Sequence, residues 1–93
     1  MRLTVEFLGP SRRLAQTRET TLDVVDTATY RDVLREIARL HPPLVDAIIT
    51  TTPDCALAPA FMLNVDGRHA VADLDAPAEA GQRLIIMIME AGG

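Results

Sequence analysis

The chain has 93 residues, enough for one domain with a modest core, and it carries a net charge of −4. With no tryptophan, one tyrosine and two phenylalanines, the core has to be built from aliphatic side chains. The negative charge disfavours nucleic acid and anionic membrane surfaces as partners.

The sequence also limits where the protein works and what it holds. Cys55 is the only cysteine, so an internal disulfide is excluded, and no group of Cys and His has the spacing of a metal site. No signal peptide opens the chain, and no apolar run approaches membrane-spanning length. We therefore expect a cytoplasmic protein with no membrane partner, no bound metal and no bound cofactor.

Two strands are predicted near the N-terminus. Apolar and polar residues alternate over residues 3–7 and again over residues 19–25, as they do in strands with one buried face. Gly9, Pro10 and Ser11 interrupt the pattern between them. We expect the two strands to form an antiparallel hairpin with a wide loop.

One long helix follows these strands. Thr29 with Asp32 three residues later forms the capping-box pattern of a helix start, and the pair Pro42-Pro43 ends the helix at His41. Apolar residues recur at helical spacing between these limits, so one face can dock on a sheet. They are Tyr30, Val33, Leu34, Ile37 and Leu40.

The second half of the chain begins with an irregular segment. Residues 42–60 show no sustained periodicity, so we expect a loop with at most a short helical turn. Strand alternation returns over residues 61–65, followed by Asp66-Gly67, a favoured two-residue hairpin turn, and a short returning strand at residues 70–71. After an acidic loop, residues 83–89 form the last strand.

The predicted order β-β-α-β-(β)-β indicates an α+β roll. We expect a single domain over residues 1–93, with a mixed sheet of four to five strands and one main helix packed on one face. The last strand is apolar on both faces, which is typical of a central strand. It should lie beside the first strand and run parallel to it.

Alternate residues of the last strand should face opposite sides of the sheet. We assign Leu84, Ile86 and Ile88 to the helix side, because Leu and Ile specify a core better than Met. The opposite face then carries an apolar surface typical of partner binding. It comprises Ile85, Met87 and Met89, beside Leu8 and Met62. Two alternatives stay open, namely that the strand pairs in a homodimer or that residues 42–60 fold over this surface.

A family resemblance follows from these features together. The β-grasp order, the Asp66-Gly67 hairpin, the turn at residues 81–83 and the final Ala91-Gly92-Gly93 resemble the ubiquitin-like sulfur carriers of the MoaD/ThiS group. The resemblance spans essentially the whole chain, and its most specific element is Gly-Gly at the C-terminus directly after a strand. It implies a β-grasp fold with a flexible tail over residues 90–93.

The resemblance also implies a protein substrate rather than an enzyme. An adenylating enzyme of the MoeB/ThiF type would use ATP to convert the carboxylate of Gly93 to an acyl-adenylate, and a sulfur donor would then leave a thiocarboxylate. Gly92 and Ala91 would keep the tail slender enough to enter that enzyme. A sulfur acceptor, such as the large subunit of molybdopterin synthase, would bind next. Both partners would dock on the same face, which comprises Leu8, Ile85, Met87 and Met89.

Within this group, the chain is most similar to the small subunit of molybdopterin synthase, which points to molybdenum cofactor biosynthesis. It differs in lacking prolines between the last strand and the tail and in the length of residues 42–60. Carriers for cysteine, thiamine, tRNA or natural-product synthesis therefore stay open. So do a ubiquitin-like modifier joined through Gly93 to lysines of other proteins, and an interaction module whose glycines are incidental.

Other polar residues have simpler interpretations. We expect His41 to carry a partial positive charge that favours the helix dipole, and His69 to lie on the surface. Cys55 is expected in a loop, without a motif that would support a sulfur relay. Asp73, Asp75 and Glu79 before the last strand and Glu90 beyond it could form an acidic rim that steers the tail toward a basic channel, but ordinary solvation explains them equally well.

The exposed helix face is expected to carry local ion pairs between charges three or four residues apart. The charges concerned are Arg31, Asp32, Arg35, Glu36 and Arg39.

Overall fold

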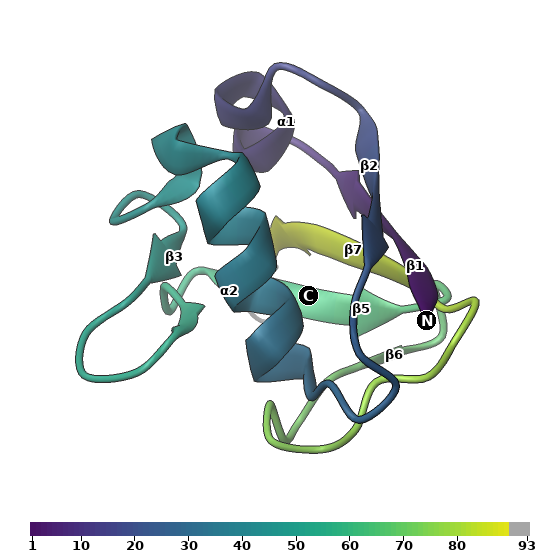
Figure 1. Ribbon diagram of the computed structural model, residues 1–93. Helices are drawn as coiled ribbons and strands as arrows, with labels where there is room; N and C mark the ends of the chain where they lie inside the picture. Colours follow the sequence, from purple (N-terminus) through teal and green to yellow (C-terminus); the bar gives the residue numbers. More distant parts are fainter. Residues whose placement is uncertain (90–93) are drawn as a thin grey trace.

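The computed structural model describes residues 1–89, so the predicted tail residues Ala91, Gly92 and Gly93 lie outside the described part. Five strands form one mixed sheet in the order β2-β1-β7-β5-β6. Their bounds are β1 Arg2–Phe7, β2 Glu19–Asp23, β5 Phe61–Val65, β6 His69–Ala70 and β7 Arg83–Ile88. The main helix, α2, spans Tyr30–Leu40 and crosses one face of this sheet (Figure 1). The predicted α+β roll is confirmed.

The last strand is central, as predicted. β7 pairs in parallel with β1, with Val5 opposite Leu84 and Phe7 opposite Ile86, and antiparallel with β5, with Leu63 also opposite Ile86. Figure 1 shows β7 between these two neighbours. Both edges of β7 are hydrogen-bonded to neighbouring strands, so its backbone is not available to pair with another chain. Only its side chains, on the two faces of the sheet, can make further contacts.

The core lies between the sheet and α2. The capping box at Thr29 and Asp32 is present, and His41 caps the other end of the helix, as the sequence predicted. Leu40 was expected in the core but is 41% exposed, because at this end of the helix Leu44 takes the buried position. The largest fully buried side chains are Leu3, Val5, Phe7, Leu22, Val33, Leu34, Ile37, Leu44, Ile48, Ile49, Leu84 and Ile86.

The connection between β1 and β2 was predicted as a loop but contains a short helix, α1 (Pro10–Ala15). Proline is well suited to the first helical turn, where its missing N–H has no intrahelical partner. Gly9 precedes it with a φ of 59°, a conformation that glycine adopts without strain. The Gly-Pro pair therefore starts a helix here instead of ending all regular structure.

Residues 42–60 also contain more structure than expected. They form a single turn of 3-10 helix, η1 (Pro42–Leu44), and a two-stranded ribbon of β3 (Ile49–Thr50) and β4 (Ala56–Leu57). Leu44, Ile48, Ile49 and Cys55 from this segment join the helix-side core. Neither α1 nor α2, the α-helices within residues 1–89, is long and apolar enough to cross a membrane.

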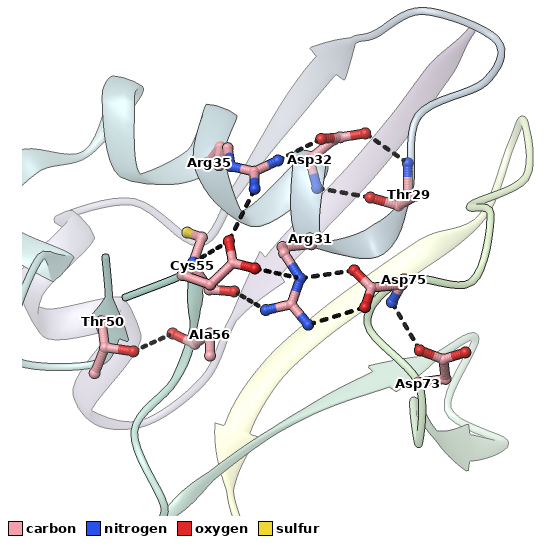
Figure 2. A network of polar contacts seen from close by, with 10 residues as sticks. Thr29, Arg31, Asp32, Arg35, Thr50, Cys55, Ala56, Asp73 and Asp75 are labelled. Carbon is pink, nitrogen blue, oxygen red and sulfur yellow. Dashed lines mark hydrogen bonds and ion pairs between the residues drawn. The ribbon is translucent and has the colours of Figure 1, made fainter. Parts of the chain in front are cut away.

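The first arginine of α2 ties this segment to the loop before β7 (Figure 2). The Arg31 guanidinium donates to Asp75 at 2.8 Å and to the carbonyl oxygen of Cys55 at 2.5 Å, and its side chain is only 17% exposed. The hydrogen bond from Arg31 holds the pKa of Asp75 below its ordinary value. Arg31 therefore has a structural role, whereas the expectation of local ion pairs holds for Arg35 with Asp32 and for Arg39 with Glu36.

Arg31→Ala should destabilise the fold clearly more than Arg35→Ala. The first change leaves the Cys55 carbonyl and Asp75 without their donor, whereas Arg35 is 53% exposed and its ion pairs are screened by water. We expect the drop in the midpoint of urea unfolding to be at least about twofold larger for Arg31→Ala. Equal drops for the two variants would contradict the role assigned to Arg31.

His41 does not behave as its sequence position suggested. Its ring packs edge-on against Phe7 with 5.1 Å between ring centroids, and its Nε2 is buried without a hydrogen-bond partner among the described residues. Burial lowers the pKa of His41 from the ordinary value of 6.5, which disfavours the positive charge. The expectation that a positive charge on His41 favours the helix dipole is therefore wrong, because the imidazole is packed against Phe7 in a form that disfavours the charge.

The His41 site should make the fold less stable in mild acid. Because the pKa of His41 is lowered on folding, the folded chain binds fewer protons than the unfolded chain near pH 6. The contribution of this site to the free energy of unfolding is therefore fully present above pH 6.5 and is lost as the pH falls below that value. Urea midpoints measured from about pH 7.5 to about pH 5.5 should fall, and His41→Gln should flatten this slope. His69→Gln, at an exposed position, is the matched control and should leave the slope intact.

Candidate partner-binding face

The sheet face opposite α2 carries an apolar patch centred on β7. Met87 lies opposite Met62 of β5, and Leu8, just after β1, lines the same hollow as Met87. Ile85 precedes Met87 on this face, and Met89, just after β7, lines a hollow with Met62. We call these five residues the Met87 patch: Leu8, Met62, Ile85, Met87 and Met89.

The patch is uncovered in the described part of the chain. Leu84 and Ile86 are fully buried on the helix side, whereas Ile85 and Met87 are partly exposed and Met89 is 51% exposed. The buried residues of the 42–60 segment belong to the helix-side core, whereas Ala56 and Leu57 line a hollow with Met62 and Met89 at one border of the patch. Burying one side chain of this size stabilises a complex by about 1.5–3 kcal/mol. Partner binding at this face stays a prediction.

One assignment in the last strand is wrong. Ile88 was placed in the core with Leu84 and Ile86, but it is 45% exposed. It has the correct parity, because it lies opposite Phe61 on the helix side. Its strand extends beyond the residues that cover Ile86, so Ile88 lines a surface hollow with Leu8 and Gly9 and enlarges the apolar surface near the tail.

A charged cluster borders the patch on the side of β2. Arg83 donates to Glu6 at 2.8 Å and also to Glu19, so one guanidinium on β7 bridges β1 and β2. The hydrogen bonds that Arg83 donates to Glu19 and Glu6 raise its pKa. Arg83 offsets one of the two carboxylate charges, and the neighbouring apolar patch is the distinctive feature of the face.

Two contacts fix the path of the backbone as it leaves the sheet. The Leu8 N–H donates to the Ile86 carbonyl at 3.1 Å, and the Met89 N–H donates to the Ala60 carbonyl at 2.8 Å. Ser11 of α1, fully buried, accepts from the Leu8 N–H at 3.0 Å, and its hydroxyl lies 3.0 Å from the Ile86 carbonyl. These contacts hold the end of β7 and Met89 in place beside the Met87 patch.

Sequence reasoning missed Ser11 because it assigned residues 9–11 to a break. The signal was available, since a proline preceded by glycine and followed by four residues without glycine or proline fits a helix start. The contact of Ser11 with the Ile86 carbonyl could not be predicted, because it depends on the parallel pairing of β1 and β7. A local sequence pattern does not specify this pairing.

The acidic loop lies at the start of β7. Asp73, Asp75 and Glu79 precede this strand, and its six residues span roughly 20 Å. Asp75 is also bound by Arg31. The steering rim considered from the sequence stays a prediction, because Glu90 and the tail lie outside the described residues.

The remaining titratable residues form no second site. Cys55 is buried and belongs to the core, where burial raises the pKa of its thiol, and His69 lies exposed on β6. Within residues 1–89, no cluster of three or more His, Cys, Asp or Glu is placed to hold a metal ion.

Several solved structures share this architecture. SAMP1 from Haloferax volcanii matches over 100% of both chains with 22% identity and a TM-score of 0.83. SAMP1 from Methanosarcina acetivorans, a small archaeal modifier protein, matches over 99% of this chain and 96% of its own with 18% identity and a TM-score of 0.78. A complex of subunits 1 and 2 of the molybdopterin-converting factor from Helicobacter pylori contains a chain that matches over 100% of both chains, with 20% identity and a TM-score of 0.56.

No protein-family model and no curated protein matches the sequence. At the identities given above, the structural likeness establishes the fold, which is the β-grasp fold of small ubiquitin-like proteins. The resemblance found in the sequence is thus confirmed at the level of the fold.

The two faces of β7 should respond differently to truncation. Ile86→Ala removes a fully buried side chain and should lower the free energy of unfolding by about 2–5 kcal/mol. Met87→Ala, one residue further on the partly exposed face, should cost about 1 kcal/mol or less. Urea unfolding of both variants measures this difference, and equal losses would mean that the Met87 patch is covered by the chain itself.

Proposed function

We propose that this chain is a sulfur carrier whose reactive group is the carboxylate of Gly93. The observation that carries the proposal is the direction of β7, which leaves the centre of a β-grasp sheet beside an uncovered apolar patch. The sequence Ala91-Gly92-Gly93 follows this strand within five residues of Ile88. A partner that grips the patch would thus receive the tail.

The chemistry follows from the state of a C-terminal carboxyl group. Its ordinary pKa is about 3.3–3.7, so it is an anion near neutral pH and a poor electrophile. In the proposed sequence a carboxylate oxygen of Gly93 attacks the α-phosphorus of ATP and pyrophosphate leaves. Hydrosulfide then attacks the acyl carbon, AMP leaves, and a thiocarboxylate remains on Gly93. Glycine at positions 92 and 93 provides a backbone without side chains for a narrow nucleotide site.

The carrier itself is a protein substrate and not an enzyme in this proposal. ATP is used by an adenylating enzyme of the MoeB/ThiF type, and the chain binds no cofactor of its own. The Met87 patch would bind this enzyme first and the sulfur acceptor afterwards. Methionine suits such a surface, because its flexible thioether fits more than one partner. We place these encounters in the cytoplasm.

The pathway we propose is molybdenum cofactor biosynthesis. It is supported by the likeness to a chain in the Helicobacter pylori complex of molybdopterin-converting factor subunits 1 and 2. By analogy, the acceptor would be a large catalytic subunit that takes sulfur from Gly93 into a pterin precursor. Carriers for cysteine, thiamine, tRNA or natural-product pathways share the same tail chemistry and remain alternatives to this acceptor.

A second candidate function is that of a protein modifier. It is favoured by the likeness to two small archaeal modifier proteins, with TM-scores of 0.83 and 0.78. In this case a lysine amine of a target protein, in place of hydrosulfide, attacks the activated carbonyl of Gly93. An isopeptide bond forms and AMP leaves. The chain has no lysine, which argues against chains built by joining copies of the protein through lysine.

Intact-mass measurement separates these functions. The chain with Gly93 as its last residue is incubated with an adenylating enzyme, ATP and sulfide. We expect the mass to increase by the difference between sulfur and oxygen, because the thiocarboxylate replaces the carboxylate. Deleting Gly93 should abolish the increase.

Matched variants test the role of the face in the same assay. Met87→Glu puts a charge in the patch and should slow the sulfur exchange by about tenfold or more, whereas Thr21→Glu on the outer strand β2 should not. Covalent adducts with other proteins in a cell extract would favour the modifier. Unchanged mass with every adenylating enzyme and acceptor of the source genome would contradict both functions.

A further inference from the structure

The arginines of this chain divide into two groups. All nine basic residues are arginine, and five of them pair with carboxylates within residues 1–89. The others are Arg12, Arg13, Arg18 and Arg68, which have no carboxylate partner in the described part of the chain. In a protein of net charge −4, unpaired arginines are an exception that needs an explanation.

Three of the four unpaired arginines lie within seven residues, in α1 and the turn after it. The Arg12 Nε donates to the Phe7 carbonyl at 3.1 Å, and the Phe7 N–H donates to the Arg18 carbonyl at 2.9 Å. Both arginines are thus tied to the residue before Leu8 of the Met87 patch. Arg13 is exposed on α1.

Arg12 and Arg18 also share a hollow on the molecular surface. They line it together with Arg83 and its two carboxylate partners, Glu6 and Glu19. The three guanidinium groups outnumber the two carboxylates, so the hollow keeps one excess positive charge beside an apolar surface.

We propose that Arg12, Arg13 and Arg18 form a docking site for acidic side chains of a partner protein whose apolar surface covers the Met87 patch. Charge complementarity selects this occupant, since guanidinium groups bind carboxylates with paired hydrogen bonds. Binding to nucleic acid is disfavoured by the net charge of the whole chain. The site orients the partner, because three of the four arginines without a carboxylate partner in residues 1–89 lie in α1 and the turn after it, which follow the end of β1.

The inference rests on the proposed function only for the identity of the partner. Arg68 provides a matched control, because it is also exposed and unpaired but lies in the turn between β5 and β6. That turn meets the start of β7, since the Asp66 N–H donates to the Arg83 carbonyl. Arg68 therefore marks the opposite end of the strand.

A titration that needs no activating enzyme tests the site. The ¹⁵N-labelled 93-residue chain is titrated with a hexaglutamate peptide while the arginine Nε–Hε resonances are followed. We expect Arg13 and Arg18 to shift several-fold more than Arg68. Equal shifts at all three would overturn the proposal, as would a short DNA duplex of equal charge that shifts Arg13 and Arg18 more strongly than the peptide does.

Association kinetics with the adenylating enzyme give the second readout. Arg18→Glu and Arg68→Glu change the net charge equally, but only the first should reduce the association rate, by about tenfold at low salt and less at high salt. Equal rates for the two variants would overturn the proposal. If the sulfur exchange itself fails, the peptide titration still decides the inference, so the two failures are distinguishable.

Discussion

The parallel pairing of β1 with β7 is the constraint on which the rest of this structure depends. It brings the last strand to the centre of the sheet, where both of its edges are paired. Only the side chains on its two faces can then contact the core or a partner. The same pairing places Leu8 next to the end of β7, where Ser11 and the Leu8 N–H both meet the Ile86 carbonyl. A segment that leads to the C-terminal residues is thus built into the most strongly connected part of the fold.

The apolar composition of the last strand follows from this position. Its helix-side residues, Leu84 and Ile86, close a core that has few aromatic side chains to fill it. Its outward residues, Ile85 and Met87, contribute nothing comparable to that core and stay partly exposed. An exposed apolar surface of this kind is costly in a monomer, and its cost is offset when a partner covers it. Arg12 and Arg18, which share a hollow with the Arg83 ion cluster, place positive charge at one border of this surface and so favour one orientation of the partner.

Much of the fold could be predicted from the sequence, because the local sequence patterns of strands, helix start and turn agree with the side chains that the structure buries. Alternation defined the strands, the capping box defined the start of α2, and Asp66 and Gly67 both have positive φ, as the predicted hairpin turn requires. The errors arose where one signal has two meanings. Pro10 both interrupts a strand and starts a helix, and His41 at a helix end was buried against Phe7 instead of charged. Periodicity could not reveal the core residues of the 42–60 segment, because they come from turns and two-residue strands.

The candidate site could be predicted only in part, since strand parity identified Ile85, Met87 and Met89 but could not show that Ile88 lies beyond the core. The central claim is that the Met87 patch is the surface that an activating enzyme covers. Three of the four methionines lie in the patch, and Met1, at the start of β1, is a built-in control. With ¹³C-labelled methionine methyl groups, addition of the adenylating enzyme should shift or broaden Met62, Met87 and Met89 and leave Met1 unchanged. Binding that perturbs Met1 while the three patch methyl groups keep their free positions would contradict the account.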